Sequence, residues 1–197
     1  YRVGVLFASF SLWRNKMRVI TGSARGMTLR TLDGSDVRPT TDKVKEAVFS
    51  AIQFEIEGRQ VLDLFAGSGQ LGIEALSRGA AYAHFIDASK ESINCVKQNL
   101  QKTGLKSNAC VLQTDSLTFL KTSQNKFDIA FLDPPYSKGI LQSALPLVAE
   151  RMNDGGVIIC EHPYGEEMPQ EAGAFSVYRK YKYGKTELTV YRKKEDR

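Results

Sequence analysis

The sequence has few of the residues that build disulfide frameworks, metal sites or membrane spans. Its three cysteines, Cys95, Cys110 and Cys160, form no C-x-x-C pair, so we interpret them as reduced, buried thiols. His84 and His162 have no partner at metal-ligand spacing, which argues against a zinc site. No apolar run approaches the roughly 20 residues that a membrane helix needs. We therefore expect a cytoplasmic protein, a monomer without a metal or a membrane partner.

Acidic residues are missing from the first part of the chain. Residues 1–32 hold six Arg or Lys and no Asp or Glu, although the net charge of the whole chain is only +5. A basic segment of this kind could bind the phosphate backbone of a nucleic acid, but it could also simply keep the protein surface soluble. A second basic stretch near the C-terminus consists of Arg179, Lys180, Lys182, Lys185, Arg192, Lys193 and Lys194.

The patterning divides the chain into three parts. Residues 1–16 fit poorly with the better-patterned segment that begins at Met17, and we interpret them as an upstream extension or a cloning remnant. They resemble a weak signal peptide, but no small-residue cleavage site comes after them. Residues 17–58 read as a small N-terminal hairpin around Gly22 and Gly26, followed by a helix from Thr40 or Thr41 to about Ile56. Residues 59–197 form the main domain.

Strand and helix patterns alternate from Gln60 onwards. The expected strands are 61–65, 82–86, 109–113, 127–132 and 156–160, with a hairpin of 175–183 and 186–192 at the end. The expected helices are 70–78, 89–103, a short one that carries Leu117 and Leu120, and 138–152. Phe127–Leu132 is apolar at every position except Asp128, as in a sheet covered on both faces. This alternation predicts an α/β fold with a doubly wound, mostly parallel sheet and an antiparallel hairpin at its C-terminal end.

A glycine-rich turn follows the first of these strands. Gly67, Gly69 and Gly72 match the G-x-G-x-x-G pattern between a strand and a helix, and Asp87 lies 20 positions after Gly67. Such a turn can approach a ligand closely, and an acid at the next strand end can accept both ribose hydroxyls. The constellation fits NAD and equally fits the methionine carboxylate and ribose of S-adenosylmethionine. A purely structural turn is the simplest alternative.

Further polar residues stand at the ends of the first and third strands. Asp63 could accept hydrogen bonds from loop amides or from a cofactor ammonium group, or be an ordinary strand-end residue. Asp115 or Ser116 could meet an adenine amino group while Leu117 packs on the ring, although Asp and Ser are also common helix caps. The predicted cofactor-binding residues are Asp63, Phe65, Gly67, Gly69, Asp87, Ala88, Asp115, Ser116 and Leu117.

The most specific motif is Asp133-Pro134-Pro135-Tyr136, directly after an apolar strand. The two prolines remove two N–H donors and stiffen the turn, which leaves carbonyls, a carboxylate and an aromatic ring facing outward. Such a corner suits a planar base with an exocyclic amino group, and it contains more than a simple turn requires. Together with the glycine turn it suggests methyl transfer from S-adenosylmethionine to a base amino group, with Asp133, Pro134, Pro135 and Tyr136 as catalytic residues.

These motifs resemble those of the amino-group methyltransferases that act on nucleic-acid bases. The match is closest to the bacterial 16S rRNA (guanine-N2)-methyltransferases of the RsmD type, and it extends from Met17 to Lys193. It is carried by Asp63–Gly69, Asp133–Tyr136, Met17–Gly22, Arg38–Phe49, Leu71–Gly79 and Tyr183–Leu188. Residues 1–16 fall outside the family pattern, and Lys43 and Lys45 stand where Arg is common.

The resemblance implies a Rossmann-like class I methyltransferase with a seven-stranded sheet, using S-adenosylmethionine on one guanine of 16S rRNA or of the assembling small subunit. We expect the base to flip out and stack on Tyr136 while Asp133 and the Pro134 carbonyl accept its N2 hydrogens. Arg38 could equally form a surface ion pair. The predicted RNA-binding residues are Arg25, Arg30, Arg38, Lys182 and Lys185.

Three other functions are compatible with parts of the sequence. A base-amino methyltransferase could act on another RNA or on DNA adenine. An NAD-dependent dehydrogenase would use the glycine turn and Asp87, but it leaves the Asp-Pro-Pro-Tyr corner and the basic ends unexplained. A non-catalytic RNA-binding module would bind RNA without turnover. The sequence lacks a separate target-recognition domain, which favours a structured RNA or ribonucleoprotein substrate.

Overall fold

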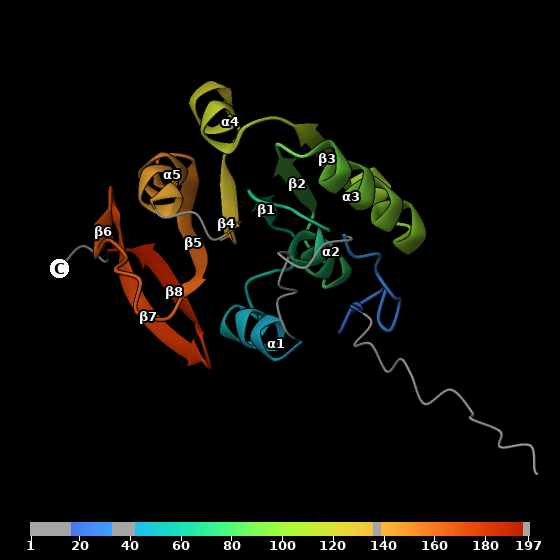
Figure 1. The fold of residues 1–197 in the computed structure, drawn as a ribbon, viewed down its shortest axis with the longest axis horizontal. Coiled ribbons are helices and arrows are strands. Elements are labelled where there is room, and N and C mark those ends of the chain that lie inside the picture. Colours follow the sequence, from blue (N-terminus) through green and yellow to red (C-terminus); the bar gives the residue numbers. More distant parts are fainter. Residues whose placement is uncertain (1–16, 33–41, 136–138, 195–197) are drawn as a thin grey trace, which may run out of the picture.

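The computed structural model describes residues 17–32, 42–135 and 139–194 (Figure 1). Predicted features at residues 1–16, 33–41, 136–138 and 195–197, including Arg38 and Tyr136, lie outside these ranges. The strands are β1 (Gln60–Asp63), β2 (Tyr82–Asp87), β3 (Ala109–Gln113), β4 (Phe127–Leu132), β5 (Met152–Pro163), β6 (Glu171–Ala172), β7 (Phe175–Tyr183) and β8 (Thr186–Lys193). The helices are α1 (Asp42–Ala51), α2 (Gln70–Ser77), α3 (Lys90–Thr103), the 3₁₀ turn η1 (Lys106–Asn108), α4 (Ser116–Thr122) and α5 (Ile140–Ala149).

These strands belong to one sheet, in the order β3-β2-β1-β4-β5-β8-β7-β6. Strands β1 to β5 pair in parallel, whereas β8, β7 and β6 join through antiparallel pairings. This confirms the predicted mostly parallel sheet with an antiparallel end. The described sheet has an eighth strand in place of the seven expected, because the two-residue β6 pairs with β7 and places Ala172 opposite Phe175.

The strand order reverses next to β1, and this reversal positions the functional site. β1 pairs with β2 on one side and with β4 on the other. The chain therefore leaves β1 toward β3 at one edge and returns across the sheet to β4. Ligands of open α/β sheets bind beyond the carboxyl ends of the strands at such a switch point. The glycine turn after β1 and the proline corner after β4 both lie at these strand ends.

Helices cover both faces of the sheet. One apolar cluster joins the sheet to α1, α2, α3 and the N-terminal hairpin, and the other joins it to α4 and α5 (Figure 1). Side chains alternate between the two: Phe131 of β4 faces the first cluster, and Leu132 faces the second. Apart from half-buried Asp128, the residues of β4 are therefore apolar and buried on both faces of the sheet, as predicted.

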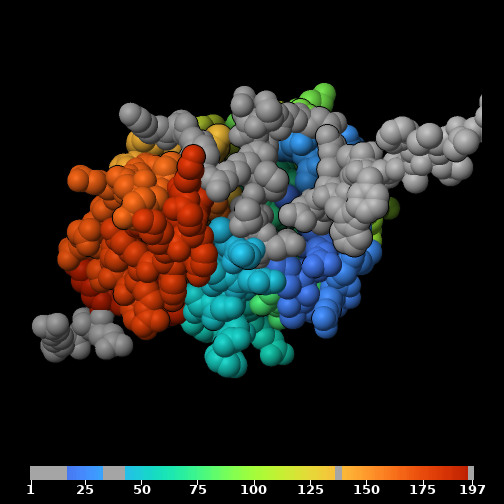
Figure 2. All heavy atoms as spheres, turned by 60° about the horizontal axis from the view of Figure 1, so that its bottom comes forward, coloured from blue at the N-terminus to red at the C-terminus, as the bar shows by residue number. Residues whose placement is uncertain are grey.

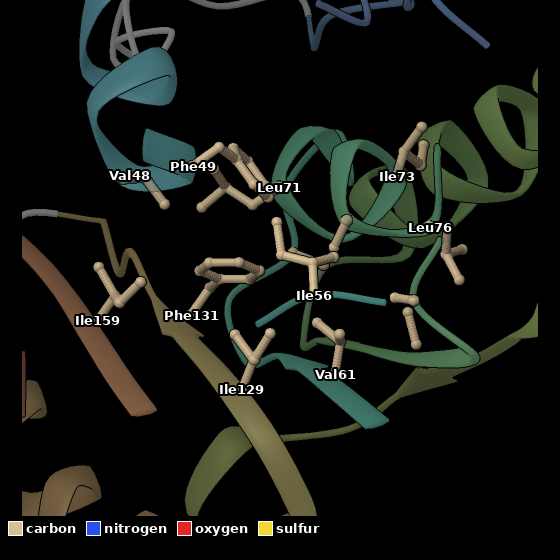
Figure 3. Packing of buried hydrophobic residues seen from close by; sticks show 14 of the residues in the cluster. Val48, Phe49, Ile56, Val61, Leu71, Ile73, Leu76, Ile129, Phe131 and Ile159 are labelled. Carbon is tan, nitrogen blue, oxygen red and sulfur yellow. The ribbon is translucent and has the colours of Figure 1, made fainter. Parts of the chain in front are cut away.

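The packing of α1 on the sheet centres on two phenylalanines. Phe49 of α1 and Phe131 of β4 lie 5.5 Å apart between ring centroids, in a tilted arrangement (Figure 3). The Arg78 guanidinium also packs over the Phe49 ring, 4.5 Å from its centroid. Tilted ring pairs of this kind contribute about 0.5–1.5 kcal/mol beyond their buried area. This contact fixes α1 under the strand that ends at the proline corner.

The N-terminal segment pairs with itself and is held by one buried carboxylate. The Val19 N–H donates to the Met27 carbonyl (3.0 Å), and Arg18 and Thr28 form an antiparallel bridge. The Glu74 carboxylate of α2 accepts the N–H groups of Ile20 (2.7 Å) and Thr21 (2.9 Å). The ammonium of Lys45, fully buried in α1, lies 3.8 Å from the same carboxylate. Glu74 therefore joins three separate segments around a single charge. Figure 2 shows the hairpin in blue beside α1 in cyan.

Two helix boundaries differ from the sequence predictions. The first helix ends at Ala51 and not near Ile56, because the chain turns there and the Glu55 N–H donates to the Ile52 carbonyl. Ile52 and Ile56 are nevertheless buried, which explains the extended apolar pattern. The helix expected at 138–152 is α5, Ile140–Ala149, since Met152 already pairs with Phe127 as the first residue of β5.

Candidate active site

Four carboxylates stand at the carboxyl ends of four adjacent strands. Asp87 ends β2, Asp63 ends β1, Asp133 follows β4, and Glu161 lies near the end of β5. The register of β4 and β5 pairs Leu132 with Cys160, so Asp133 and Glu161 come next to each other. Side chains alternate along a strand, and both acids therefore fall on the sheet face of the first apolar cluster. The topology assembles a row of acids that are far apart in sequence.

This row borders a cavity of about 470 Å³. The predicted site residues that line it are Asp63, Phe65, Gly67, Asp87, Ala88, Asp115, Ser116, Asp133, Pro134 and Pro135. The glycine turn and the proline corner thus share one cavity, as the predicted mechanism requires. Two predicted cofactor residues do not line it. Gly69 is the N-cap of α2, and a Cβ added there would lie 3.1 Å from the Val96 side chain. Leu117 packs against the second apolar cluster.

The glycine turn is held by the acids that flank it. Gly67 adopts a φ of +52°, and its N–H donates to Asp87 Oδ2 (2.8 Å). The Gly72 N–H donates to Asp63 Oδ2 (3.0 Å). A Cβ on Gly72 would lie 2.3 Å from the Phe85 ring, so only glycine lets α2 approach β2 this closely. The acids predicted to contact a ligand therefore also fix the shape of the turn.

Asp63 is the most strongly perturbed acid of the cavity. Its side chain is 2% exposed. Burial raises the pKa of the Asp63 carboxyl to about 8, and the neighbouring Asp133 and Asp87 carboxylates add to this rise against the hydrogen bond from Gly72. The ionised form is thus disfavoured until a positive charge enters the cavity. An acid of this kind at the bottom of a cleft is typical of functional sites.

Asp115 caps a helix and also lines the cavity. Its Oδ1 accepts the Thr118 N–H (2.9 Å) and hydroxyl (3.0 Å) at the start of α4. These hydrogen bonds lower the pKa of Asp115. Asp115 therefore caps α4 through Oδ1, as the helix-cap alternative predicted. The neighbouring Ser116 is buried and borders the same cavity.

Several residues that line the cavity were not anticipated from the sequence. They include Met17, Leu32, Gln70, Glu91, Ile140 and Glu161. Glu161 directly follows the expected strand 156–160, so the strand-end signal that selected Asp87 could have found it. Gln70 is 9% exposed, and its buried Oε1 accepts no hydrogen bond from the described residues. This oxygen is available to a donor group of a bound ligand.

The electrostatic character of the cavity is uniform. Six acidic residues line it, namely Asp63, Asp87, Glu91, Asp115, Asp133 and Glu161. No Lys or Arg among the described residues lines it. An anionic pyrophosphate would be repelled, whereas a ligand with sulfonium and ammonium groups would be attracted. The acidic residues of this cavity therefore fit S-adenosylmethionine better than NAD.

A second cavity of about 580 Å³ adjoins the first. The two share Pro134, Pro135 and Glu161. Asp133 borders the first cavity but not the second, and buried Pro134 lies between the two cavities. The remaining walls come from the start of α5 and from the turn after β5. The proline corner is thus a partition between two cavities.

The four predicted basic residues that the structure describes lie on the surface outside both cavities. Arg25, Lys182 and Lys185 are exposed, and exposed Arg30 donates to the Gln98 side chain (2.6 Å). The Lys182 ammonium lies 3.4 Å from the ring centroid of Tyr164, a residue of the second cavity. In the same region the Arg179 guanidinium approaches two rings of β7. Figure 2 shows the N-terminal hairpin and the C-terminal strands on either side of α1.

Two of the three cysteines are buried, and so is His162, which also lines the second cavity. Cys95 and Cys160 are buried, while Cys110 is only half-buried, and all three are free thiols. His162 is buried and its Nε2 lies 2.8 Å from the Thr189 hydroxyl. Within residues 17–32, 42–135 and 139–194 no cluster of three or more His, Cys, Asp or Glu could hold a metal ion. No helix in these ranges has the length and apolar character that crossing a bilayer requires.

Comparison with known proteins places these features in a family. A family model described as Conserved hypothetical protein 95 matches residues 17–192. Ribosomal RNA small subunit methyltransferase D of Haemophilus influenzae is 41% identical over 140 residues, 70% of this chain and 72% of that protein. The solved chain yhhF of Escherichia coli superposes with a TM-score of 0.81 at 34% identity, covering 90% of this chain and 98% of that one.

A more distant structure extends the comparison of the fold. It is the Thermus thermophilus 16S rRNA N2 G1207 methyltransferase RsmC, solved with AdoMet and guanosine. The TM-score is 0.71 at 22% identity, and the match covers 91% of this chain and 50% of that protein. The fold of this chain is therefore that of the class I methyltransferases. The chain belongs to the RsmD family of rRNA methyltransferases, which confirms the family resemblance and the fold class predicted from the sequence.

Proposed function

We propose that this protein transfers a methyl group from S-adenosylmethionine to the exocyclic N2 amine of a guanine in 16S rRNA. The observation that carries the proposal is the position of Asp133, which lines the acidic cavity beside the proline partition. Membership of an rRNA methyltransferase family implies S-adenosylmethionine as the methyl donor, and the relative from Haemophilus influenzae is named for the small-subunit rRNA. The guanine N2 position rests on the family resemblance and on the chemistry of the corner.

The first cavity would hold the cofactor. S-adenosylmethionine supplies an electrophilic methyl group on a positively charged sulfur. Asp87 would accept the ribose hydroxyls with its free lone pairs, and Asp115 or Ser116 would meet the adenine amino group. Asp63 and the unpartnered Gln70 Oε1 are acceptors for the ammonium group. Gly67, Phe65 and Ala88 would form the wall around these groups.

Asp133 and Pro134 would prepare the amine. The Asp133 carboxylate and the Pro134 carbonyl accept the two N2 hydrogens, which draws the nitrogen lone pair out of conjugation with the ring. Held in this way, the N2 lone pair would face the methyl carbon of the bound cofactor, whose sulfur would keep the electron pair when the methyl group is transferred. The Asp133 carboxylate then accepts one N2 proton. Positioning of this kind can supply roughly 7–11 kcal/mol in favourable cases.

The surface residues would bring the RNA to this corner. Tyr136, which lies outside the described residues, is the proposed stacking platform for the flipped base. Lys182 and Lys185 would contact phosphates next to the second cavity, because the Tyr164 N–H donates to the Lys185 carbonyl (2.9 Å) and joins the two segments. Arg25 and Arg30 are proposed to contact phosphates on the other side of α1. Arg38, which lies outside the described residues, is also proposed to contact RNA.

A direct test uses small ribosomal subunits from cells that lack this protein. They are incubated with the purified protein and S-adenosylmethionine carrying a deuterated methyl group, and the RNA nucleosides are analysed by mass spectrometry. We expect labelled N2-methylguanosine. Label in N6-methyladenosine or in another RNA would support the base-amino alternative. Absence of label from RNA, with the protein folded and the cofactor bound, would contradict the proposal.

A further inference from the structure

The second cavity contains an acid that the proposed mechanism leaves without a role. Glu161 is, among the described residues, the one acid that lines both cavities. It belongs to β5, where its backbone pairs with Leu188 of β8. A side chain on a paired strand is held more firmly than one on a loop. Glu161 is therefore a rigidly placed acceptor at the partition between the two cavities.

The second cavity has a preformed wall and a size suited to a base. Its volume of about 580 Å³ falls in the range of about 300–1,000 Å³ that small-molecule sites occupy. The Gln142 amide of α5 donates to Glu166 Oε1 (3.2 Å) and to the Glu167 carbonyl (3.3 Å), which ties the turn after β5 to the helix. Exposed Tyr164 borders the same turn. The wall that this turn forms is thus held in place by hydrogen bonds to α5.

The charge of this cavity distinguishes between bases. Glu161, Glu166 and Glu167 line it together with buried His162, whose Nε2 lies 2.8 Å from the Thr189 hydroxyl, and no Lys or Arg of the described residues does. Carboxylates accept hydrogen bonds and do not donate them when ionised. The Watson–Crick edge of guanine presents an N1–H donor beside the N2 amine, whereas adenine presents an N1 lone pair at the same place. A carboxylate facing this edge favours guanine and repels adenine.

We propose that the acceptor base occupies the second cavity and that Glu161 selects guanine by accepting its N1–H. This inference rests on the proposed function and names the residue that chooses its substrate. With Glu161 at N1, both N2 hydrogens remain for Asp133 and the Pro134 carbonyl on the cofactor side of the partition. The hydrogen bond also enriches the ring and its amine in electron density, which favours attack by N2.

Binding of ribonucleosides to the protein saturated with S-adenosylhomocysteine tests the assignment. Guanosine and inosine carry N1–H, while 2-aminopurine riboside carries the N2 amine but has a lone pair at N1. We expect the wild type to bind guanosine and inosine at least about tenfold more tightly than 2-aminopurine riboside, the discrimination of one good base contact. In Glu161→Gln the amide can donate to N1, so the guanosine preference over 2-aminopurine riboside should fall about tenfold.

The control is Glu171→Gln, which changes an exposed acid of β6 outside both cavities and should leave the preference unchanged. Melting temperatures confirm that each variant is folded. A wild-type preference in Glu161→Gln, or an equal loss of preference in Glu171→Gln, would overturn the assignment. Labelling of N2-methylguanosine by the wild type alongside an unchanged Glu161→Gln would reject Glu161 and retain the proposed function. A changed preference in Glu161→Gln without any RNA labelling by the wild type would retain the role of Glu161 in guanine binding and reject the proposed function.

Discussion

The cofactor cavity and the antiparallel C-terminal strands carry opposite charge within one sheet. Six acids line the cavity at the ends of the parallel strands, whereas β7 and the turn after it carry Arg179, Lys180, Lys182 and Lys185. The net charge of +5 conceals this separation. A positively charged methyl donor and a polyanionic substrate need opposite fields, and the two regions supply them a few strands apart. Variants that alter one region should therefore leave the binding function of the other intact.

The largest effect is expected for Asp133→Ala. Removing the acceptor of the amine should lower methyl transfer by about 10²–10⁴-fold, as for other groups that position and accept a proton. Affinity for S-adenosylmethionine and for RNA should change little. Single-turnover rates with labelled cofactor measure the first effect, and calorimetric titration the second.

Asp154→Ala is the control for Asp133→Ala. It removes an Asp of the same sheet that is 92% exposed and paired only with Lys193 among the described residues. Its methyl transfer should equal that of the wild type. Full activity in Asp133→Ala would remove the proposed role of the proline corner.

The next effect concerns the basic strands. Reversing charge in the double variant Lys182→Glu, Lys185→Glu should weaken RNA binding by at least about tenfold and reduce the salt slope by about one per lysine. Affinity for S-adenosylmethionine should stay unchanged. The double variant Lys102→Glu, Lys106→Glu makes the same charge change near the β3 edge of the sheet and should retain RNA binding. Equal losses in both variants would show that only net charge matters.

A smaller effect is expected on the pH dependence of stability and cofactor affinity, and it should depend on Asp63 and not on the other acids of the cavity. Because its pKa is about 8 in the ligand-free protein, its contribution to stability is complete below about pH 4 and is lost as the pH rises through 8. Binding of a cationic cofactor favours the ionised form, so the protein should release nearly one proton at pH 7. Affinity for S-adenosylmethionine should rise from pH 6 to 8 and then level off.

Titration calorimetry in two buffers of different ionisation enthalpy measures this proton release. Asp63→Asn should abolish it and flatten the pH dependence of both affinity and melting temperature. Asp115→Asn is the comparison, since the pKa of Asp115 is lowered and this acid should be ionised throughout the range. Proton release that persists in Asp63→Asn would mean that another group titrates.

The smallest effect distinguishes cations that hold the fold from those proposed to bind RNA. Arg192 of β8 donates two hydrogen bonds to the Glu55 carboxylate, at 2.8 and 2.7 Å. Both side chains are about one-third exposed, so Arg192→Lys should lower the free energy of unfolding by at most about 1 kcal/mol. Its RNA affinity should stay within about twofold of the wild type. Denaturant titration and filter binding measure the two quantities.

The sequence predicted the parts of this molecule that are set by local patterns. Alternation of strands and helices predicted β3 and β4 to the residue, and the glycine and proline motifs identified opposite walls of one cavity. Glu161 was missed although it stands at a strand end, because no neighbouring motif drew attention to it. Only the β4–β5 register shows that it lies beside Asp133.

Long-range contacts account for most of what the sequence could not reveal. The burial of Lys45 depends on Glu74, 29 positions away in the sequence, and no local pattern marks that pair. The early end of α1 depends on a turn that still buries Ile52 and Ile56. The second cavity forms between the turn after β5 and the start of α5, two segments whose closeness follows from the completed sheet.

The separation of charge is tested most directly by titrating one protein sample with S-adenosylmethionine, with NADH and with small-subunit rRNA at several salt concentrations. The account predicts that S-adenosylmethionine binds at one site, that NADH does not compete with it, and that only the RNA affinity falls steeply with salt. Displacement of S-adenosylmethionine by NADH would contradict it, because a cavity lined by six acidic residues and no described Lys or Arg disfavours an anionic dinucleotide.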